Sequence, residues 1–371
     1  MMDRGLTDVI IARIAPLAPA EKILLCKACE CEQDLTSMTK TQVERIIGRS
    51  FTSRAVWNMD DFRAQAERDA SVARMRGIGY VSYRSPLYPP LLREIWDPPV
   101  LLFYRGRLPD PERSALAVVG TRNPSPPALL WAYDTAKILG GKGIPVISGL
   151  ARGIDAIAHR GNIDGGGATI AVLGSGLDEI YPAINRPLAR RIVERDGVLL
   201  SEYPPGTKPR KWHFPARNRI ISGLARGIVI AEAPEASGAL ITARFALEQG
   251  RDLWVSAVGV ADGPYASLRG GGKKLAEDGA PVLSSAEGIL QDWFFASPSS
   301  SSSPDSFSSN SFSSNSFPAN FFFRKKEEKK NSHQLELENL EAEEKKEKKA
   351  KNEGEALGAS LAKSLNIVYK E

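Results

Sequence analysis

Residues 116–174 read LAVVGTRNPSPPALLWAYDTAKILGGKGIPVISGLARGIDAIAHRGNIDGGGATIAVLG and decide the fold. Three short apolar runs stand in this stretch, at 116–121, 145–149 and 169–174, and each ends in a turn of small residues. The segments between them have the length and apolar spacing of amphipathic helices. Short apolar strands that alternate with helices are typical of a parallel sheet covered on both faces. The stretch therefore predicts an α/β, Rossmann-like domain.

The same unit continues to about residue 290 and supplies four more predicted strands. These runs are VLLSE (198–202), GIVIAEA (227–233), DLWVSAV (252–258) and APVL (280–283). The predicted fold is thus a Rossmann-like parallel sheet with helices on both faces.

Three segments flank or extend this unit, and we predict three domains from them. Residues 1–79 have apolar patches at helical spacing, which predicts a small all-helical domain. A helix-hairpin-helix or SAM-like DNA module and a plain set of capped core helices explain this domain equally well. Residues 80–295 hold a proline-rich connector, with one strand-like run at 100–104, and the Rossmann-like domain. Residues 296–371 are Ser/Phe/Asn-rich and then Lys/Glu-rich, a composition that predicts a disordered, low-complexity tail.

Composition limits the compartment and the partners. The formal charge of +5 permits a polyanionic partner. No apolar run approaches the roughly 18 residues of a membrane span, so we expect no membrane partner, and we expect no signal peptide. Cys26, Cys29 and Cys31 are odd in number and crowded, which favours a reducing cytoplasm over a disulfide framework. Tetrahedral zinc needs four ligands, and the histidines lie far away in sequence, so we expect no metal and no cofactor.

The stretch from Ser201 to Thr242 holds the main candidate for a binding site. Cations interleaved with flat aromatic rings suit a single-stranded nucleic acid, because cations neutralise phosphates and rings stack on unstacked bases. A solvated basic loop with two packing aromatics is the alternative. The cations are Lys208, Arg210, Lys211, Arg217 and Arg219, and the rings are Trp212 and Phe214.

The carboxyl ends of the predicted strands are rich in small residues, and ligands of open parallel sheets bind at these ends. Glycines there let the backbone approach an anion, and the following helix N-termini offer free N–H groups, so a phosphate site is expected. Glycines that only serve tight turns are the alternative. No P-loop or complete dinucleotide fingerprint is present. The small residues are Gly120-Thr121, Ser148-Gly149, Gly174-Ser175-Gly176 and Ser237-Gly238.

Two pairs of residues could serve catalysis, and neither indicates an enzyme. Asp155 and His159 share a helix face, and a capping aspartate hydrogen-bonded to a core-facing histidine is the favoured interpretation. Glu202 and Glu232 each end a strand and could meet near the site. We predict no catalytic residue.

Six segments, in this order, resemble the DNA-processing protein A (DprA, or Smf) family: VGTRNPS, SGLARGIDAIAH, IAVLGSGLDEIYP, LLSEYPPG, FPARNRIISGLA and EASGALITARFALEQGR. They span about residues 80–290. The resemblance implies a cytoplasmic Rossmann-like protein that binds single-stranded DNA without base specificity. It also implies a homodimer that helps to load the RecA recombinase during uptake of transforming DNA.

The resemblance also implies site residues. The candidate DNA-binding set is Arg122, Ser148, Gly149, Gly174, Lys208, Arg210, Lys211, Trp212, Phe214, Arg217, Asn218, Arg219, Ser237 and Gly238. Within it, Ser148-Gly149 and Ser237-Gly238 would hold phosphates, and the residues that would line the DNA groove are Arg122, Lys211, Phe214, Arg217 and Arg219.

The chain departs from the family pattern at SAVG (256–259) and RGGGKKLAEDGA (269–280), where the family usually has VPG and a glycine–asparagine pair. The tail also stands where many relatives have a winged-helix domain. Two alternative functions use the same fold. One is a nucleoside monophosphate hydrolase of the lysine-decarboxylase-like group, whose P-G-G-x-G-T-x-x-E signature is absent. The other is a nucleotide-binding sensor, which would leave the basic aromatic loop unexplained.

Overall fold

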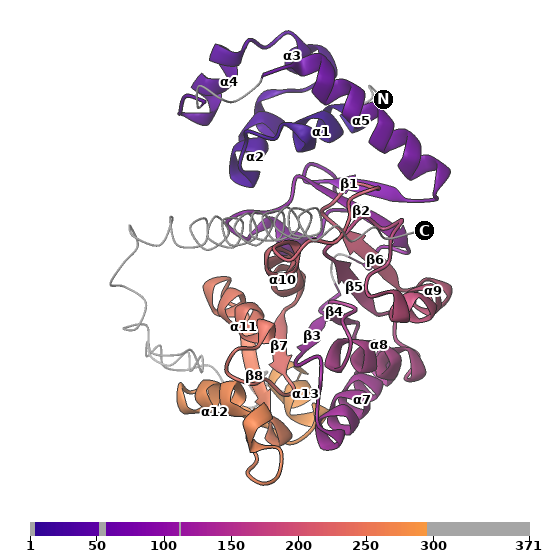
Figure 1. Cartoon of the computed structure of the whole chain (residues 1–371), viewed down its shortest axis with the longest axis vertical. Helices are drawn as coiled ribbons and strands as arrows, with labels where there is room; N and C mark the ends of the chain where they lie inside the picture. The colour runs from indigo at the N-terminus through magenta and orange to yellow at the C-terminus, as the bar shows by residue number, and fades with distance from the viewer. Residues whose placement is uncertain (1–3, 52–56, 111–112, 295–371) are drawn as a thin grey trace, which may run out of the picture. The chain divides into compact units, whose positions relative to one another are not determined.

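The computed structural model describes residues 4–51, 57–110 and 113–294 (Figure 1). The described chain begins with helices and continues into an α/β region. The predicted α/β fold class, with helices before the sheet, is confirmed. The predicted disordered tail lies outside the described residues.

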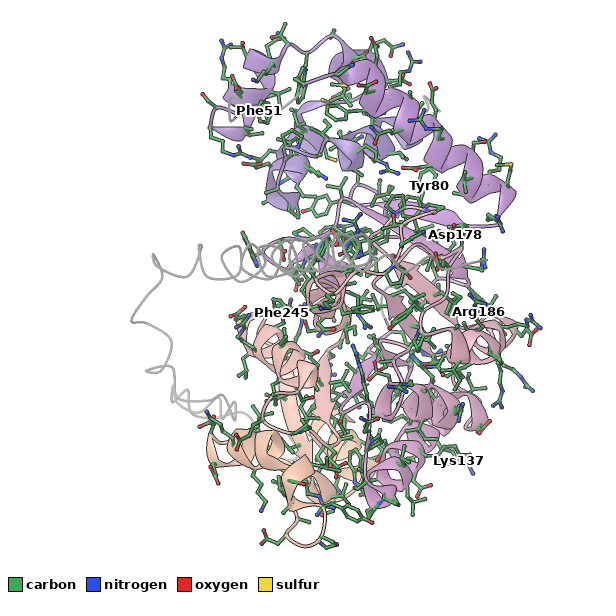
Figure 2. All side chains as sticks on the ribbon, in the orientation of Figure 1. Phe51, Tyr80, Lys137, Asp178, Arg186 and Phe245 are labelled. Carbon is green, nitrogen blue, oxygen red and sulfur yellow. The ribbon has the colours of Figure 1, made fainter. Side chains whose placement is uncertain are left out.

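The N-terminal region is helical, as predicted. Its helices are α1 (Arg4–Arg13), α2 (Pro19–Ala28), α3 (Glu32–Thr36), α4 (Lys40–Ile47) and α5 (Met59–Met75). Helix α4 shows why the sequence folds this way: the Thr39 side chain accepts a hydrogen bond from the backbone N–H of Gln42, and Gly48 ends the helix at a φ of 76°. Phe51 stacks on Trp57 in this region at 5.4 Å between ring centroids (Figure 2).

The cysteines lie in the same region as free thiols. Cys26 and Cys29 are buried and Cys31 is half-buried. Burial raises the pKa of the Cys29 thiol to about 11, so it is protonated at neutral pH. Arg84 of the connector donates to the Cys26 carbonyl oxygen at 3.0 Å and pairs with the buried carboxylate of Asp8. These contacts join the helices to the connector.

The sheet has nine strands in the order β1-β2-β6-β5-β4-β3-β7-β8-β9. The strands β3 to β9 pair in parallel, as predicted. Their bounds are β3 (Leu116–Val119), β4 (Val146–Ser148), β5 (Ile170–Leu173), β6 (Val198–Ser201), β7 (Gly227–Ile230), β8 (Asp252–Ser256) and β9 (Val282–Leu283).

The connector contributes more to the sheet than its single strand-like run predicted. It contains β1 (Gly79–Ser82), α6 (Pro90–Arg93) and β2 (Leu101–Gly106). Strand β2 pairs antiparallel with β6, and β1 pairs antiparallel with β2. The prediction missed β1 because it is a four-residue edge strand with only Val81 fully buried, so it has no apolar run.

Helices cover both faces of the sheet (Figure 1). On β3, Leu116 and Val118 pack toward α7, α8 and α13, whereas Ala117 and Val119 pack toward α10 and α11. Successive side chains of a strand point to opposite faces, which is why the run is apolar throughout. The helix bounds are α7 (Pro126–Gly141), α8 (Ile154–Asp164), α9 (Arg186–Glu194), α10 (His213–Leu224), α11 (Gly238–Glu248), α12 (Gly270–Glu277) and α13 (Ala286–Phe294).

Helices α7 and α8 approach each other closely through glycine. A Cβ atom at Gly140 would overlap the carbonyl oxygen of Asn162 on α8. The next residue, Gly141, is exposed, and a Cβ atom there would lie 3.9 Å from the carbonyl oxygen of Gly165. A side chain at position 140 would therefore collide with α8, whereas a side chain at position 141 has room.

We predict opposite effects of alanine at these two positions. Gly140→Ala should lower the free energy of unfolding by about 1–3 kcal/mol, because the helices must separate. Gly141→Ala is the matched control and should raise it by up to about 1 kcal/mol, because alanine favours helix. Urea unfolding measures both variants. Equal effects of the two substitutions would show that the helix contact does not require glycine.

Candidate nucleic-acid interface

A pocket of about 560 Å³ lies at the carboxyl ends of the strands, between the loop after β3, α8, α10 and the start of α11. An open parallel sheet places its ligand site at this edge, as expected. The structure brings half of the candidate set into the lining of this pocket. These residues are Arg122, Lys211, Phe214, Arg217, Asn218, Ser237 and Gly238.

Phe214 lies at the mouth of the pocket as the second residue of α10. Its ring is half-buried, and the guanidinium of Arg122 lies 5.7 Å from the ring centroid. Pro215 follows in the first turn of the helix, where proline is tolerated. The ring of Tyr181 lies 5.5 Å from the Phe214 centroid at a tilt of 40°. Sequence reasoning did not select Tyr181, although it stands in the IAVLGSGLDEIYP segment.

Arg217 forms the charged floor of the pocket. Its side chain is buried, and Nη1 donates a 2.7 Å hydrogen bond to the carbonyl oxygen of Val172. A Cβ atom at Gly149 would overlap the guanidinium, so a larger residue there would displace Arg217. Burial lowers the pKa of Arg217 to about 10, while the charge of Asp155 acts in the opposite direction. Arg217 therefore remains a cation at neutral pH.

Ser148 and Gly149 support the floor and do not offer their polar groups to a phosphate. The Ser148 hydroxyl donates to the Val118 carbonyl oxygen at 2.8 Å, and the Gly149 N–H donates to the Asp155 carboxylate at 3.1 Å. Their predicted role as a phosphate holder is therefore not supported by this geometry. The carboxylate of Asp155, a residue of the chain itself, already accepts the hydrogen bond of the Gly149 N–H.

Ser237 and Gly238 do line the pocket, at the N-terminus of α11. The Ser237 hydroxyl accepts a hydrogen bond from the Ala239 N–H at 3.2 Å, and no atom lies within 4 Å of a Cβ built on Gly238. Asn218 donates from Nδ2 to the Gly238 carbonyl oxygen at 3.2 Å and ties α10 to α11. The helix dipole adds partial positive charge at this rim.

Arg219 lies on another face of α10 and is not in the pocket lining. It is buried and pairs with Asp97 at 2.8 Å and with Glu202 at 2.7 Å. Residues two apart on a helix do not share a face, so Arg217 and Arg219 diverge. The structure thus assigns Arg219 to a buried ion-pair network and not to the predicted DNA groove.

The rest of the basic loop does not enter this pocket. Lys208 and Arg210 are exposed, and the Arg210 guanidinium lies 5.2 Å from the Trp212 ring centroid. Trp212 immediately precedes α10 and packs edge-on against His213 at 5.8 Å. Gly174 lies beneath the start of α10, where a Cβ atom would approach the Phe214 ring to 3.2 Å.

The two glutamates do not meet, contrary to the expectation that they could. Glu202 follows β6 and Glu232 follows β7, and three strands lie between β6 and β7 in the sheet. Strand order is a tertiary property that the sequence does not display. Each carboxylate is used in a separate ion pair.

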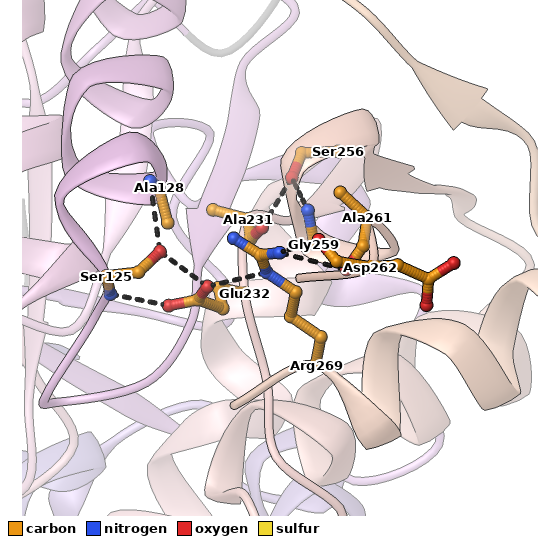
Figure 3. A network of polar contacts seen from close by, with 9 residues as sticks. All are labelled: Ser125, Ala128, Ala231, Glu232, Ser256, Gly259, Ala261, Asp262 and Arg269. Carbon is orange, nitrogen blue, oxygen red and sulfur yellow. Dashed lines mark hydrogen bonds and ion pairs between the residues drawn. The ribbon is translucent and has the colours of Figure 1, made fainter. Parts of the chain in front are cut away.

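Glu232 organises a polar network beside the pocket (Figure 3). Its carboxylate accepts hydrogen bonds from the Ser125 N–H and hydroxyl, both at 2.7 Å, and pairs with Arg269 at 3.2 Å. Its carbonyl oxygen accepts from the Thr121 N–H at 2.8 Å. The network therefore fixes the loop that carries Arg122.

Both segments that depart from the family pattern contribute to this network. Arg269 begins the RGGGKKLAEDGA segment and also donates to the Ala261 carbonyl oxygen at 2.9 Å. Ser256 begins the SAVG segment, and its hydroxyl accepts from the Gly259 N–H at 2.9 Å and donates to the Ala231 carbonyl oxygen (Figure 3). Most of the second segment is helix α12, and both segments are held by these hydrogen bonds.

Asp155 and His159 are structural, but they do not bond in the way expected. Asp155 accepts from the N–H groups of Gly149 and Ala151, and His159 Nδ1 lies 2.7 Å from the Thr169 hydroxyl. Burial, with a smaller contribution from Arg217, lowers the pKa of His159 to about 3. The histidine does face the core, as predicted.

The chain is a Rossmann-like α/β protein with a pocket at the strand ends that is lined by basic and aromatic side chains. A family model described as DNA recombination-mediator protein A matches residues 79–294. The chain therefore belongs to the DNA recombination-mediator protein A family, and the resemblance read from the motifs is confirmed.

Individual relatives agree with the family. The chain is 37% identical over 293 residues to DNA processing protein DprA of Bacillus subtilis (strain 168), covering 78% of this chain and 96% of that protein. It is 43% identical over 210 residues to DNA processing protein DprA of Streptococcus pneumoniae, covering 56% and 72%. The X-ray structure of DprA from Streptococcus pneumoniae matches with a TM-score of 0.64 and 32% identity, covering 79% of this chain and 98% of that one.

Among the helices of the described residues, none is both long enough and apolar enough to cross a membrane.

We predict that His159 makes stability depend on pH. The unfolded histidine binds a proton near its ordinary pKa of about 6.5, whereas the folded one stays neutral to about 3. Its contribution to stability is therefore full above pH 6.5 and is lost as the pH falls, with a slope of up to about 1.4 kcal/mol per pH unit. Urea unfolding between pH 7.5 and pH 5 measures this slope in the parent and in His159→Gln. Identical slopes in both proteins would contradict the assignment.

Proposed function

We propose that this protein is a sequence-independent single-stranded DNA-binding protein. The observation that carries the proposal is the pocket in which the half-buried Phe214 ring lies beside Arg122 and above the buried Arg217 cation. A ring can stack on a base only if that base is unstacked, which selects single strands over duplex. The cations and the α11 N-terminus supply the attraction for phosphates.

The polar groups of the pocket favour little discrimination among bases. Asn218 uses its amide N–H on the Gly238 carbonyl oxygen, and the Ser237 hydroxyl accepts from the Ala239 N–H. Base-specific recognition needs side chains with free donors and acceptors aimed at base edges. The pocket instead offers positive charge for phosphates and an aromatic ring for stacking, and both interactions are possible with any base.

Family membership supports a proposal for the cellular role. We propose that the protein acts in the cytoplasm as a homodimer that protects incoming DNA and helps to load the RecA recombinase during natural transformation, competence and recombination. The role is that of a mediator without catalysis. The acidic residues considered for catalysis support a role without catalysis. Asp155, Glu202 and Glu232 all form hydrogen bonds or ion pairs that stabilise the fold.

A titration tests the proposed function. Fluorescent oligo-dT, a blunt duplex of equal length and thymidine monophosphate are each titrated at several salt concentrations. We expect tight binding of oligo-dT, weaker binding of duplex, and affinity that falls with salt. Preferential binding of the mononucleotide would favour a nucleotide sensor, and its hydrolysis would favour the hydrolase. Equal affinity for duplex and oligo-dT would contradict the proposal.

We predict that loss of Arg122 affects DNA binding, whereas loss of Arg219 affects stability. Arg122→Ala should weaken binding to every oligonucleotide and flatten the slope of log K against log salt by about one unit at an unchanged melting temperature. Arg160→Ala, another exposed arginine, is the matched control and should bind like the parent. Arg219→Ala should cost about 3–5 kcal/mol of stability, because it leaves the buried carboxylate of Asp97 and the half-buried carboxylate of Glu202 unpaired. A parental salt slope in Arg122→Ala would contradict the DNA contact.

We predict that Phe214 contributes more stacking than Trp212. Phe214 lines the pocket, whereas Trp212 packs with Arg210 and His213 outside its lining. Phe214→Ala should cost about 1–3 kcal/mol of single-strand affinity at an unchanged salt slope. Trp212→Ala should cost less affinity and more stability. Parental binding by a Phe214→Ala protein that melts early would assign this ring to the core instead.

A further inference from the structure

Arg269 lies outside the lining of the pocket and is almost completely buried, with 3% of its surface exposed. Its Nε pairs with the Glu232 carboxylate at 3.2 Å (Figure 3). Its Nη1 donates to the carbonyl oxygens of Ala261 and Asp262 at 2.9 and 3.2 Å. A buried charge is costly unless it is paired and hydrogen-bonded, and Arg269 meets both conditions. The residue therefore connects an exposed loop of the chain to a buried carboxylate beside the pocket.

The Glu232 carboxylate leads from Arg269 to the loop that carries Arg122. It accepts hydrogen bonds from the N–H and the hydroxyl of Ser125, both at 2.7 Å, and Ser125 is the N-cap of α7. The backbone carbonyl oxygen of Glu232 accepts from the Thr121 N–H at 2.8 Å. Thr121 and Ser125 stand on either side of Arg122 in sequence. Both ends of this short loop are therefore bonded to one buried glutamate.

A second part of the pocket lining is supported from the same place. Two N–H groups in the first turn of α12 donate to the Ala233 carbonyl oxygen at 3.0 and 3.2 Å. The segment that follows Ala233 contributes Pro234 and Ser237 to the pocket lining. Arg269 immediately precedes α12. The supports of both pocket loops therefore meet at this arginine.

We infer that Arg269 is a positioning residue for single-strand binding. Its side chain acts through Glu232 on the loop that places the Arg122 guanidinium beside the Phe214 ring. This inference rests on the proposed function and extends it to a residue that does not line the pocket. The alternative, in which Arg269 only stabilises the fold, is an outcome of the test.

A double-mutant cycle in the full chain tests the inference. The affinity for oligo-dT and its salt slope are measured for Arg269→Met, for Arg122→Ala and for the combined variant. Arg269→Met should weaken binding about 10-fold and flatten the salt slope by up to about one unit, because the phosphate contact of Arg122 is misplaced. In the Arg122→Ala background the same substitution should weaken binding by less than about 3-fold, since the group that it positions is already absent.

Arg251→Met is the matched control. The Arg251 side chain is only 8% exposed, donates to the Leu91 and Gly223 carbonyl oxygens at 2.7 and 3.3 Å, and is not in the pocket lining. Its loss should lower the melting temperature and leave the affinity and the salt slope unchanged.

Ser125→Gly covers the case in which Arg269→Met does not fold. It removes the hydroxyl bond to Glu232, while glycine is still acceptable as an N-cap. This variant should weaken oligo-dT binding about 3-fold in the parental background and should have almost no effect when Arg122 is already replaced.

Three results would overturn the inference while the proposed function stands. They are parental affinity in Arg269→Met or, if that variant does not fold, in Ser125→Gly; losses of equal factor with and without Arg122; and an equal loss in the Arg251→Met control. Equal losses in both backgrounds would mean that Arg269 acts through general stability or charge. Failure of the parent to bind oligo-dT would overturn the proposed function itself.

Discussion

The buried guanidinium of Arg217 is the interaction on which the site depends. A charge removed from water is costly unless it is paired and hydrogen-bonded. Here the Val172 carbonyl oxygen accepts one hydrogen bond, and the buried Asp155 carboxylate supplies the opposite charge. Asp155 in turn accepts from the Gly149 N–H, and a side chain at position 149 would displace the guanidinium. The SGLARGID segment and the FPARN segment are thus two halves of one buried electrostatic arrangement.

The position at which α10 begins then decides which of its side chains line the pocket. Phe214, Arg217 and Asn218 lie three and four residues apart and therefore share one face, which lines the pocket. Arg219 falls on another face, where Asp97 and Glu202 neutralise it. One short helix therefore contributes both to the binding surface and to the contact with the connector.

The two faces of α10 show which features of the structure could be predicted from the sequence and which could not. The parallel strands were predictable because their runs are apolar throughout, and a pocket at the carboxyl ends of the strands could be expected from that topology. The roles of Arg217 and Arg219 depend on where α10 begins, and the separation of Glu202 from Glu232 depends on strand order. Tyr181 was missed because no basic residue stands beside it in sequence, and the fold alone brings it to Phe214.

Two separate networks fix the pocket. The hydrogen bonds from Arg217 to the Val172 carbonyl oxygen and from the Gly149 N–H to Asp155 hold the floor. The Glu232 network holds the loop of Arg122 through Ser125 and Arg269. The cations at the rim, by contrast, are exposed and long, so they can follow a chain whose phosphates repeat at different positions. A rigid floor with an adaptable rim suits a ligand with a uniform backbone and variable bases, because the invariant groups meet the fixed charges. The same arrangement would be poorly suited to a single small substrate, which needs several directed polar contacts to fix its orientation.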